Sequence, residues 1–247
     1  MPEIYEDGLR MVYQGSKAKL VDWLLPLMKP YLDKAPVYYE PFVGGANMIC
    51  KVPHAVRIGS DSNKYLIALL KKVQEDVTVL PAEIDEDTYT RVKASPGVFE
   101  PWFVGMVAFC ATFRGIYWGG FARDEGGKRP SQLLNNLRQQ APLLNGIEFR
   151  CADYRRIKYS KFSPGTLFYC DIPYKSTSGY DQYFDHDAFY RWCYGVHNAG
   201  HTILLSEFWA PSCFEELGNT KRIDTLCCSY EGDKPQEVTE RLFVFRG

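Results

Sequence analysis

The residues best suited to chemistry in this sequence follow one apolar stretch in its second half. Residues 167–170 are apolar, and Asp171, Ile172, Pro173 and Tyr174 come directly after them. A buried strand that ends here would present a carboxylate, a rigid turn and an aromatic ring in close succession. These groups suit a base that stacks on the tyrosine while its amino group donates to acceptors. The same pattern also occurs as an ordinary turn after a strand, so it is not specific by itself.

Three further candidate strand ends carry glycine or aspartate. Gly44 and Gly45 follow the apolar residues 37–39, and the lack of a Cβ there lets a ligand approach the backbone. Asp61 comes after the next apolar run, near the ~20-residue offset at which an acid in α/β folds binds ribose hydroxyls. Asp153 ends a third run. Both residue types are common in turns, but their repetition at successive strand ends favours a ligand site at one edge of a sheet.

Hydrophobic periodicity predicts the elements that must position these residues. We expect strands at residues 37–39, 55–59, 147–152, 166–170, 202–205, 222–229 and 240–245, and helices at 16–25, 66–77, from 101 onward, and at 186–199. Ser16 is a plausible N-cap for the first helix, and Pro26 and Pro30 should limit its length. Strands that alternate with helices predict an α/β fold, and the last two strands, with no helix between them, predict an antiparallel hairpin.

Residues 76–145 have a different character. Acidic residues cluster at 83–87, and residues 113–123 interleave glycine, aromatic residues and arginine. This composition is typical of a surface lobe inserted into a main fold. We therefore divide the chain into a catalytic domain, residues 1–75 and 146–247, and an inserted lobe, residues 76–145.

Composition limits the class of protein. The 247 residues include 29 Lys and Arg against 30 Asp and Glu, and 46% are hydrophobic. This balance is globular and excludes a uniformly basic nucleic-acid coat, although not a local basic face. The eight cysteines show no C-x2-C spacing. We therefore expect free thiols, mostly buried, and no metal site.

The sequence also bears on where the chain works. No apolar run approaches the ~18 residues of a membrane span, and the first residues lack the pattern of a signal peptide. We expect a cytoplasmic monomer that has no membrane partner, in the host cytoplasm if a phage encodes it.

Taken together and in order, these motifs resemble those of the Dam-like, D12-class DNA adenine-N6 methyltransferases of the α group. The similar segments are residues 13–17 (glycine-lysine motif), 40–45 (S-adenosylmethionine loop), 61–63 (D-x-N), 151–154 (before the catalytic strand) and 171–174 (catalytic D-P-P-Y). The resemblance implies a Rossmann-like S-adenosylmethionine-dependent methyltransferase sheet of seven strands whose last pair is an antiparallel hairpin. It also implies that the inserted lobe is mainly helical and recognises the target sequence.

The resemblance assigns roles residue by residue. It implies S-adenosyl-L-methionine as the cofactor, double-stranded DNA as the partner and a flipped adenine as the methyl acceptor. It implies Tyr13 and Lys17 at the methionine end of the cofactor, with Phe42 and Gly44 lining it. It implies Asp61 at the ribose, and Asp153 and Tyr154 at the cofactor's adenine. The remaining implied cofactor-binding residues are Glu40, Pro41, Gly45 and Asn63. The implied catalytic residues, which would hold the target base, are Asp171, Ile172, Pro173 and Tyr174.

Two departures from the family pattern matter. Ile172 stands where the family has proline, but it keeps the backbone carbonyl, and Pro173 after it favours an extended conformation, so we expect an intact site. Residues 113–115 are reminiscent of the family's F-N-G motif. The asparagine-rich recognition hairpin of GATC enzymes, however, is not recognisable in residues 119–136. The sequence therefore does not predict the recognition site.

Basic residues of the lobe are the expected phosphate contacts: Arg114, Arg123, Lys128 and Arg129. A second basic group, at residues 150–161, flanks Asp153. Two alternatives to a DNA adenine methyltransferase stay open. One is an inactive DNA-binding decoy, an alternative raised by Ile172 at the position where the family has proline. The other is a methyltransferase of RNA or of a protein amide, which usually has asparagine in place of Asp171. The setting, a phage, a prophage or a restriction-modification system, is also open.

Overall fold

The computed structural model describes residues 11–123, 129–173, 184–218, 220–225 and 236–247. Its helices are α1 (Val21–Leu32), α2 (Lys64–Glu75), α3 (Glu86–Ala94), α4 (Pro101–Cys110), α5 (Arg129–Gln140) and α6 (His186–Asn198). Its strands are β1 (Tyr38–Glu40), β2 (Arg57–Asp61), β3 (Ile147–Cys151), β4 (Leu167–Asp171), β5 (Thr202–Glu207), β6 (Phe214–Glu216), β7 (Lys221–Thr225) and β8 (Gln236–Phe245). The side chains of residues 129, 222–225 and 236–238 lie outside the description.

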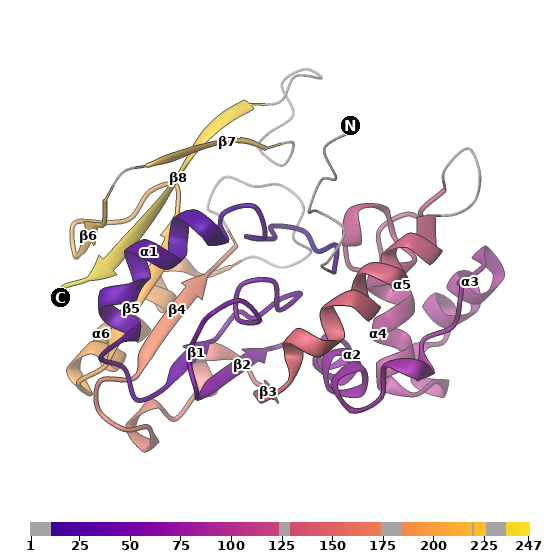
Figure 1. Ribbon diagram of the computed structural model, residues 1–247, viewed down its shortest axis with the longest axis horizontal. Coiled ribbons are helices and arrows are strands. Elements are labelled where there is room, and N and C mark those ends of the chain that lie inside the picture. The colour runs from indigo at the N-terminus through magenta and orange to yellow at the C-terminus, as the bar shows by residue number, and fades with distance from the viewer. Residues whose placement is uncertain (1–10, 124–128, 174–183, 219, 226–235) are drawn as a thin grey trace. The chain divides into compact units, whose positions relative to one another are not determined.

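The strands of the described ranges form one eight-stranded sheet (Figure 1). Its continuous path has the order β3-β2-β1-β4-β5-β8-β6, and β7 pairs with β8 beside that path. β4 is parallel to β1 and β5, whereas β8 is antiparallel to β5, β6 and β7. The predicted α/β class and the closing antiparallel pair are thus confirmed. The short β6 is the strand that the sequence pattern did not indicate.

The chain packs as two compact units. The first consists of residues up to 19, 43–52 and 59–152, and the second of residues 20–42, 53–58 and 153 onward. The first unit contains α2 to α5 and β3, and the second contains α1, α6, β1 and β4 to β8. β2 runs from the second unit into the first.

The first unit is built around α2 and α4. The apolar side chains at the predicted spacing on α2 are buried. α4 begins at Pro101, as expected, and Val104 to Cys110 are all buried. A Cβ on Gly105 would lie 2.2 Å from the carbonyl oxygen of Tyr65, so only glycine permits this close approach of the two helices. Among the described residues 77–144, the regular elements are all helical.

The core of the second unit lies between the sheet and α6. α6 is capped by Asp185, whose Oδ1 accepts from the backbone N–H of Ala188 at 2.8 Å. Its buried face packs with side chains that alternate along the strands. This cluster includes Tyr39, Phe168, Cys170, Ile172, Phe189, Trp192, Cys193, Val196, Ile203, Leu205, Phe243 and Phe245.

The expected helix at residues 16–25 is wrong in both of its bounds. Ser16 caps a turn instead, since its Oγ accepts from the N–H of Ala18 at 3.2 Å. α1 begins at Val21 and continues through Pro26 and Pro30 to Leu32. A proline inside a helix costs about 3 kcal/mol. Each buried aliphatic side chain contributes about 1.5–3 kcal/mol, and the four buried residues of α1 offset that cost: Val21, Leu24, Met28 and Leu32.

Candidate active site and cofactor-binding residues

Asp61 ends β2 and receives backbone hydrogen bonds from two directions. Its Oδ1 accepts from the N–H of Asn63 at 2.9 Å, and its Oδ2 accepts from the N–H of Gly44 at 3.3 Å. Burial raises the pKa of Asp61, and these backbone donors partly oppose the rise. A carboxylate has about four acceptor positions, so the side chain keeps capacity for hydroxyl donors of a ligand. This chemistry fits the ribose role that the resemblance implies.

Asn63 caps the helix that follows Asp61. Its Oδ1 accepts from the N–H groups of Tyr65 and Leu66 at 3.0 and 3.1 Å. The side-chain oxygen is therefore used to begin α2, which is what an asparagine N-cap ordinarily does. The implied cofactor contact of Asn63 stays a prediction.

Tyr13 packs against the glycine loop, which we define as residues 44–47. A Cβ on either Gly44 or Gly45 would lie 2.8 Å from a carbon of the Tyr13 side chain. Gly44 also has a φ of +49°, which disfavours other residues. The close approach of Tyr13 therefore favours glycine at both positions, and the left-handed φ adds a second reason for glycine at position 44. Lys17, from the same N-terminal motif, is only 4% exposed.

Glu40 and Asp171 end two neighbouring parallel strands of the second unit, β1 and β4. Glu40 is 3% exposed, and the hydroxyl of Tyr38 donates to its Oε1 at 2.6 Å. Burial raises the pKa of Glu40 well above its usual range, the Tyr38 bond opposes the rise, and the charge of Asp171 adds to it. Glu40 therefore stays protonated at pH values at which an exposed glutamate is ionised.

Phe42 and Tyr154 form an aromatic surface in the second unit. Their ring centroids are 5.2 Å apart, and Tyr154 also meets Trp192 edge-on at 5.6 Å. Phe42 is half-buried and follows the buried Pro41. Such a half-exposed ring can stack on the flat face of a base. This property fits a role for Phe42 and Tyr154 in holding a nucleoside.

Asp153 pairs with the arginine that follows it closely. Its Oδ1 accepts from the backbone N–H and from Nε of Arg155, both at 2.9 Å. This interaction with Arg155 lowers the pKa of Asp153, so the carboxylate is ionised. An ionised acceptor beside Tyr154 fits an amino group of a bound base, which is the implied contact with the cofactor's adenine.

The turn predicted to be catalytic, which we call the catalytic turn, comprises residues 171–173 of the described chain and follows β4. Asp171 is partly exposed and lies opposite Ser206 of β5. Ile172 is 3% exposed, and its side chain belongs to the hydrophobic core of the unit. This packing accommodates isoleucine where the family has proline. Tyr174, the last of the predicted catalytic residues, lies outside the described residues.

His186 is a neighbour of this turn that sequence reasoning missed. Its Nε2 lies 3.0 Å from the carbonyl oxygen of Pro173, and its Nδ1 lies 3.1 Å from the carbonyl oxygen of Phe184. In the tautomer that carries its proton on Nε2, the imidazole donates to Pro173 and links the first turn of α6 to the catalytic turn. The only local signal was a histidine directly after the Asp185 cap.

The predicted DNA contacts have different surroundings. Arg114 is exposed, has a left-handed φ of 56°, and places its guanidinium 4.9 Å from the ring centroid of Phe113. Arg123 is exposed but forms an ion pair with Glu86 of α3, with Nε donating to Oε2 at 3.1 Å. Lys128 and the side chain of Arg129 lie outside the description. A phosphate would have to compete with Glu86 for Arg123.

Gly115, beside Arg114, occupies a position in the motif at residues 113–115 that requires glycine. It has a φ of +64°, and a Cβ there would lie 2.1 Å from the carbonyl oxygen of Val12. Only glycine allows this approach between the predicted lobe and the N-terminal segment that carries Tyr13.

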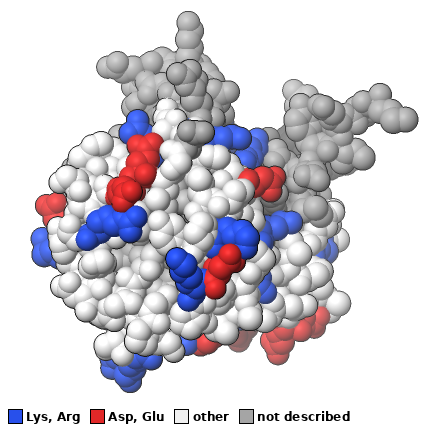
Figure 2. All heavy atoms as spheres, turned by 60° about the vertical axis from the view of Figure 1, so that its left-hand side comes forward, with Lys and Arg blue, Asp and Glu red and all other residues white. Residues whose placement is uncertain are grey.

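Charge is dispersed over the face drawn in Figure 2. Blue and red side chains alternate there among uncharged residues, without an extended area of one sign among the described atoms shown. Beside Asp153, Arg150 has a local partner, since its Nε lies 2.6 Å from Oε1 of Glu148. This dispersion agrees with the near-neutral net charge of the sequence.

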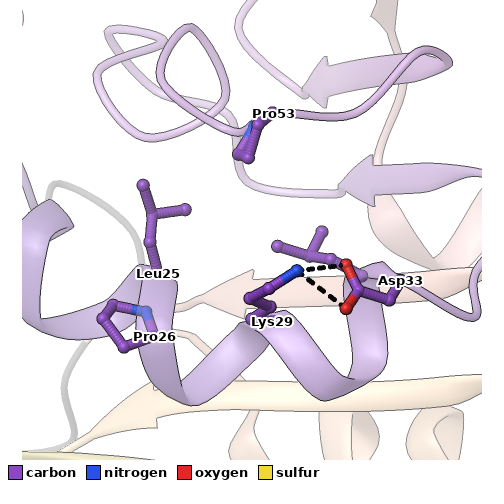
Figure 3. A pocket seen from close by; sticks show the side chains of 6 residues that line it. Leu25, Pro26, Lys29, Asp33 and Pro53 are labelled. Carbon is purple, nitrogen blue, oxygen red and sulfur yellow. Dashed lines mark hydrogen bonds and ion pairs between the residues drawn. The ribbon is translucent and has the colours of Figure 1, made fainter.

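A cavity of about 370 Å³ lies on α1 (Figure 3). Leu25, Pro26, Leu32 and Pro53 form its apolar walls, and Lys29 and Asp33 pair with each other at its edge at 2.8 Å. None of its six lining residues is a predicted cofactor or catalytic residue.

Among the described residues, no three His, Cys, Asp or Glu side chains gather as a metal site requires. None of the helices in the described ranges has the length and apolar character that a bilayer crossing needs.

The fold and these residues define a class of protein. The strand order 3-2-1-4-5 is that of Rossmann-type nucleotide-binding sheets, with a glycine loop after β1 and an acid at the end of β2. Together with the closing antiparallel strand, they make this a Rossmann-like methyltransferase fold. Residues 13–97 match the family model of the D12 class N6 adenine-specific DNA methyltransferases. Over these residues the chain is similar to that class, in agreement with the resemblance drawn from its motifs.

One curated relative extends this comparison. The chain is 24% identical over 191 residues to the Type II methyltransferase M.FokI of Planomicrobium okeanokoites. The match includes 68% of this chain and 29% of that relative, so the chain spans less than a third of the relative's length. The family match contains the Tyr13, glycine-loop and Asp61 segments, whereas the turn at Asp171 lies beyond it.

Proposed function

We propose that this protein is a site-specific DNA methyltransferase that transfers a methyl group from S-adenosylmethionine to adenine N6. The observation that carries the proposal is the family match over the glycine loop and Asp61, combined with Asp171 and Ile172 at the carboxyl end of β4. The name of M.FokI adds support, since that relative is a Type II methyltransferase. A DNA substrate in a host cell would place the reaction in the cytoplasm.

The residues fit S-adenosylmethionine. Asp61 offers an acceptor for ribose hydroxyls, and Phe42 beside Tyr154 offers an aromatic face for the cofactor's adenine. Tyr13 shapes the glycine loop at the methionine end, with Lys17 in the same segment. When bound, the cofactor supplies a methyl group on a sulfonium centre. Pro41, Glu40, Asn63, Gly44, Gly45 and Asp153 complete the residues that we assign to it.

The chain's part in the reaction is to hold the target amine. The lone pair of adenine N6 is delocalised into the ring, which makes it a poor nucleophile. Asp171 and the carbonyl of Ile172 accept its two N–H bonds, and Tyr174 stacks on the extruded base, which is worth roughly 1–3 kcal/mol. These contacts favour a pyramidal nitrogen whose lone pair points away from the ring. The acceleration then comes from positioning and polarisation.

We assign target recognition to residues 76–145, and contacts with duplex DNA to Arg114, Arg123, Lys128 and Arg129. A monomer is sufficient for this arrangement. Glycine at position 115 and the stacked pair of Phe113 and Arg114 give this segment an exposed aromatic and a fixed positive charge. Both are groups that nucleic-acid surfaces use.

The proposed function is tested by tritiated methyl incorporation into adenine-containing duplex DNA. Wild type should transfer methyl groups, and Asp171→Ala should abolish transfer while S-adenosylmethionine binding persists. Ile172→Pro keeps the carbonyl, so it should stay active, although loss of the buried isoleucine side chain should lower the melting temperature.

The other possible outcomes of this experiment distinguish between the alternative functions and mechanisms. An inert wild type beside an active Ile172→Pro would establish the inactive decoy. Methyl transfer to RNA or protein but not to DNA would establish the other alternative. An Asp171→Ala variant as active as wild type would contradict the mechanism, although the family assignment would stand.

A further inference from the structure

A buried network of side-chain amides in the first unit gives Gln140 a role. Gln140 is the last residue of α5 and is fully buried. Its Nε2 donates to the carbonyl oxygen of Gly45 at 2.8 Å and, over 3.4 Å, to Oδ1 of Asn47. Its Oε1 accepts from the backbone N–H of Met11 at 3.0 Å. One side chain thus joins α5, the glycine loop and the N-terminal segment.

Asn47 completes the network from the glycine loop. It is 4% exposed, and its Nδ2 donates to the carbonyl oxygen of Met11 and to Oγ of Ser16, both at 2.9 Å. Gln140 holds the N–H of Met11 and Asn47 holds its carbonyl, so both polar groups of that peptide segment are fixed. Tyr13, which packs on the glycine loop, follows two residues later.

Removal of the Gln140 amide would leave several buried polar groups to find new partners. The carbonyl of Gly45 and the N–H of Met11 would lose the bonds that Gln140 provides. Buried backbone groups are nearly always hydrogen-bonded, so the loop and the segment would shift to satisfy them. Such a shift moves Gly45 and Tyr13 relative to each other.

We propose that Gln140 is a positioning residue for S-adenosylmethionine, acting through Gly45 on the glycine loop and through Met11 on the segment that carries Tyr13. The inference rests on the proposed function, because it takes these two segments as cofactor-binding. It makes α5, a part of the predicted recognition lobe, a determinant of cofactor affinity in the absence of DNA.

The test is calorimetric titration of the full chain with S-adenosylmethionine, without DNA, below the temperature at which any variant starts to unfold. Gln140→Leu should raise the dissociation constant tenfold or more. Gln139→Leu is the matched control, since this neighbour on the same helix lies outside the network, and its constant should stay within twofold of wild type. Leu134→Ala removes a fully buried side chain of α5 but no member of the network. It should lower the melting temperature and leave the constant within twofold.

If Gln140→Leu does not fold, a second variant provides the test. Gln140→Asn is shorter by one methylene and cannot reach both Gly45 and Met11, so its affinity should also fall severalfold. Unchanged affinity in the folded Gln140 variants would overturn the proposal, as would an equal loss in Leu134→Ala, which would make the effect one of general stability. A wild type that binds no S-adenosylmethionine would contradict the proposed function itself, and this role with it.

Discussion

Replacement of Asp61 by alanine tests the cofactor site most directly. The proposed ribose bond to this carboxylate is charge-assisted, and such bonds are worth about 1.5–3 kcal/mol. At about 1.4 kcal/mol per factor of ten, Asp61→Ala should weaken S-adenosylmethionine binding by about 10- to 140-fold. Calorimetric titration without DNA measures this change.

The substitution also has a structural cost that can be bounded. It removes the bond from Asn63 N–H at 2.9 Å and the one from Gly44 N–H, which at 3.3 Å is longer than a usual hydrogen bond. Burial raises the pKa of Asp61, so the variant is also relieved of a buried charge. We expect a loss of about 1–2 kcal/mol in unfolding free energy, which leaves the protein folded for the titration.

Asp76→Ala provides the matched control. Asp76 is exposed, and its Oδ1 accepts from the N–H and the hydroxyl of Thr78 at 2.9 and 2.6 Å. Asp76→Ala therefore loses local hydrogen bonds to a carboxylate, as Asp61→Ala does, at a position with no predicted cofactor contact. Equal affinity in wild type and Asp61→Ala would remove Asp61 from the site. An equal loss in both variants would attribute the effect to local structure.

Three further predictions concern the catalytic turn, the DNA surface and pH. His186→Phe should lower kcat several-fold, because it releases the carbonyl of Pro173, and it should leave the dissociation constant of S-adenosylmethionine unchanged. His197→Phe on the same helix is the control. Glu86→Gln should tighten DNA binding by releasing Arg123, and Arg123→Ala should weaken it and reduce its salt dependence, as fluorescence anisotropy over a salt series would show. Glu40→Gln should gain stability over wild type as pH rises, as thermal unfolding at pH 5 and pH 8 would show.

The sign of the pH effect follows from the proton on Glu40. Its pKa is raised in the folded protein, first by burial, whereas an unfolded glutamate ionises near pH 4.3. The stability that the buried proton provides is fully present below that pH and is lost as pH rises through the folded pKa. The glutamine of the Glu40→Gln variant would keep the acceptor for Tyr38 and has no proton to lose. A stability difference independent of pH would mean that Glu40 is ionised throughout.

The kinetic and DNA predictions also have contrary outcomes. If His197→Phe reduced kcat as much as His186→Phe, the effect would come from α6 as a whole and not from the catalytic turn. If Glu86→Gln left DNA affinity unchanged, Arg123 would not be a phosphate contact. Because the Arg123–Glu86 pair is exposed, either substitution should change folding stability by no more than about 1 kcal/mol.

Local patterns in the sequence predicted most of the fold. The apolar spacing on α2 and the proline at the start of α4 correspond to the observed helices, and the apolar runs that precede Asp61 and Asp171 are strands. α1 was misplaced because its prolines and Ser16 gave the stronger local signal. The burial of its apolar side chains, which decides the outcome, depends on the rest of the unit.

The parts of the site that escaped prediction are those made by distant residues. Gln140 bonds to Gly45, which is 95 positions away, and to Met11, which is 129 positions away. Neither hydrophobic periodicity nor a short motif predicts contacts between residues so far apart in the sequence. The protonation of Glu40 could not be predicted from the sequence either, because it depends on burial and on the charge of Asp171, which ends the neighbouring strand. Local motifs identify the type of site, whereas its internal supports become visible only in three dimensions.

The position of Cys151 gives the molecule a built-in chemical handle. Burial raises the pKa of the Cys110 thiol to about 12, and it raises those of Cys170 and Cys193 as well, so these thiols resist alkylation. Cys151 is the exposed cysteine among the described residues and ends β3, where the next residue, Ala152, donates its N–H to the carbonyl of Asp61 at 2.9 Å. A fluorophore attached there would sit beside the proposed ribose contact. Its emission would report cofactor occupancy in real time, without radioactivity and without turnover.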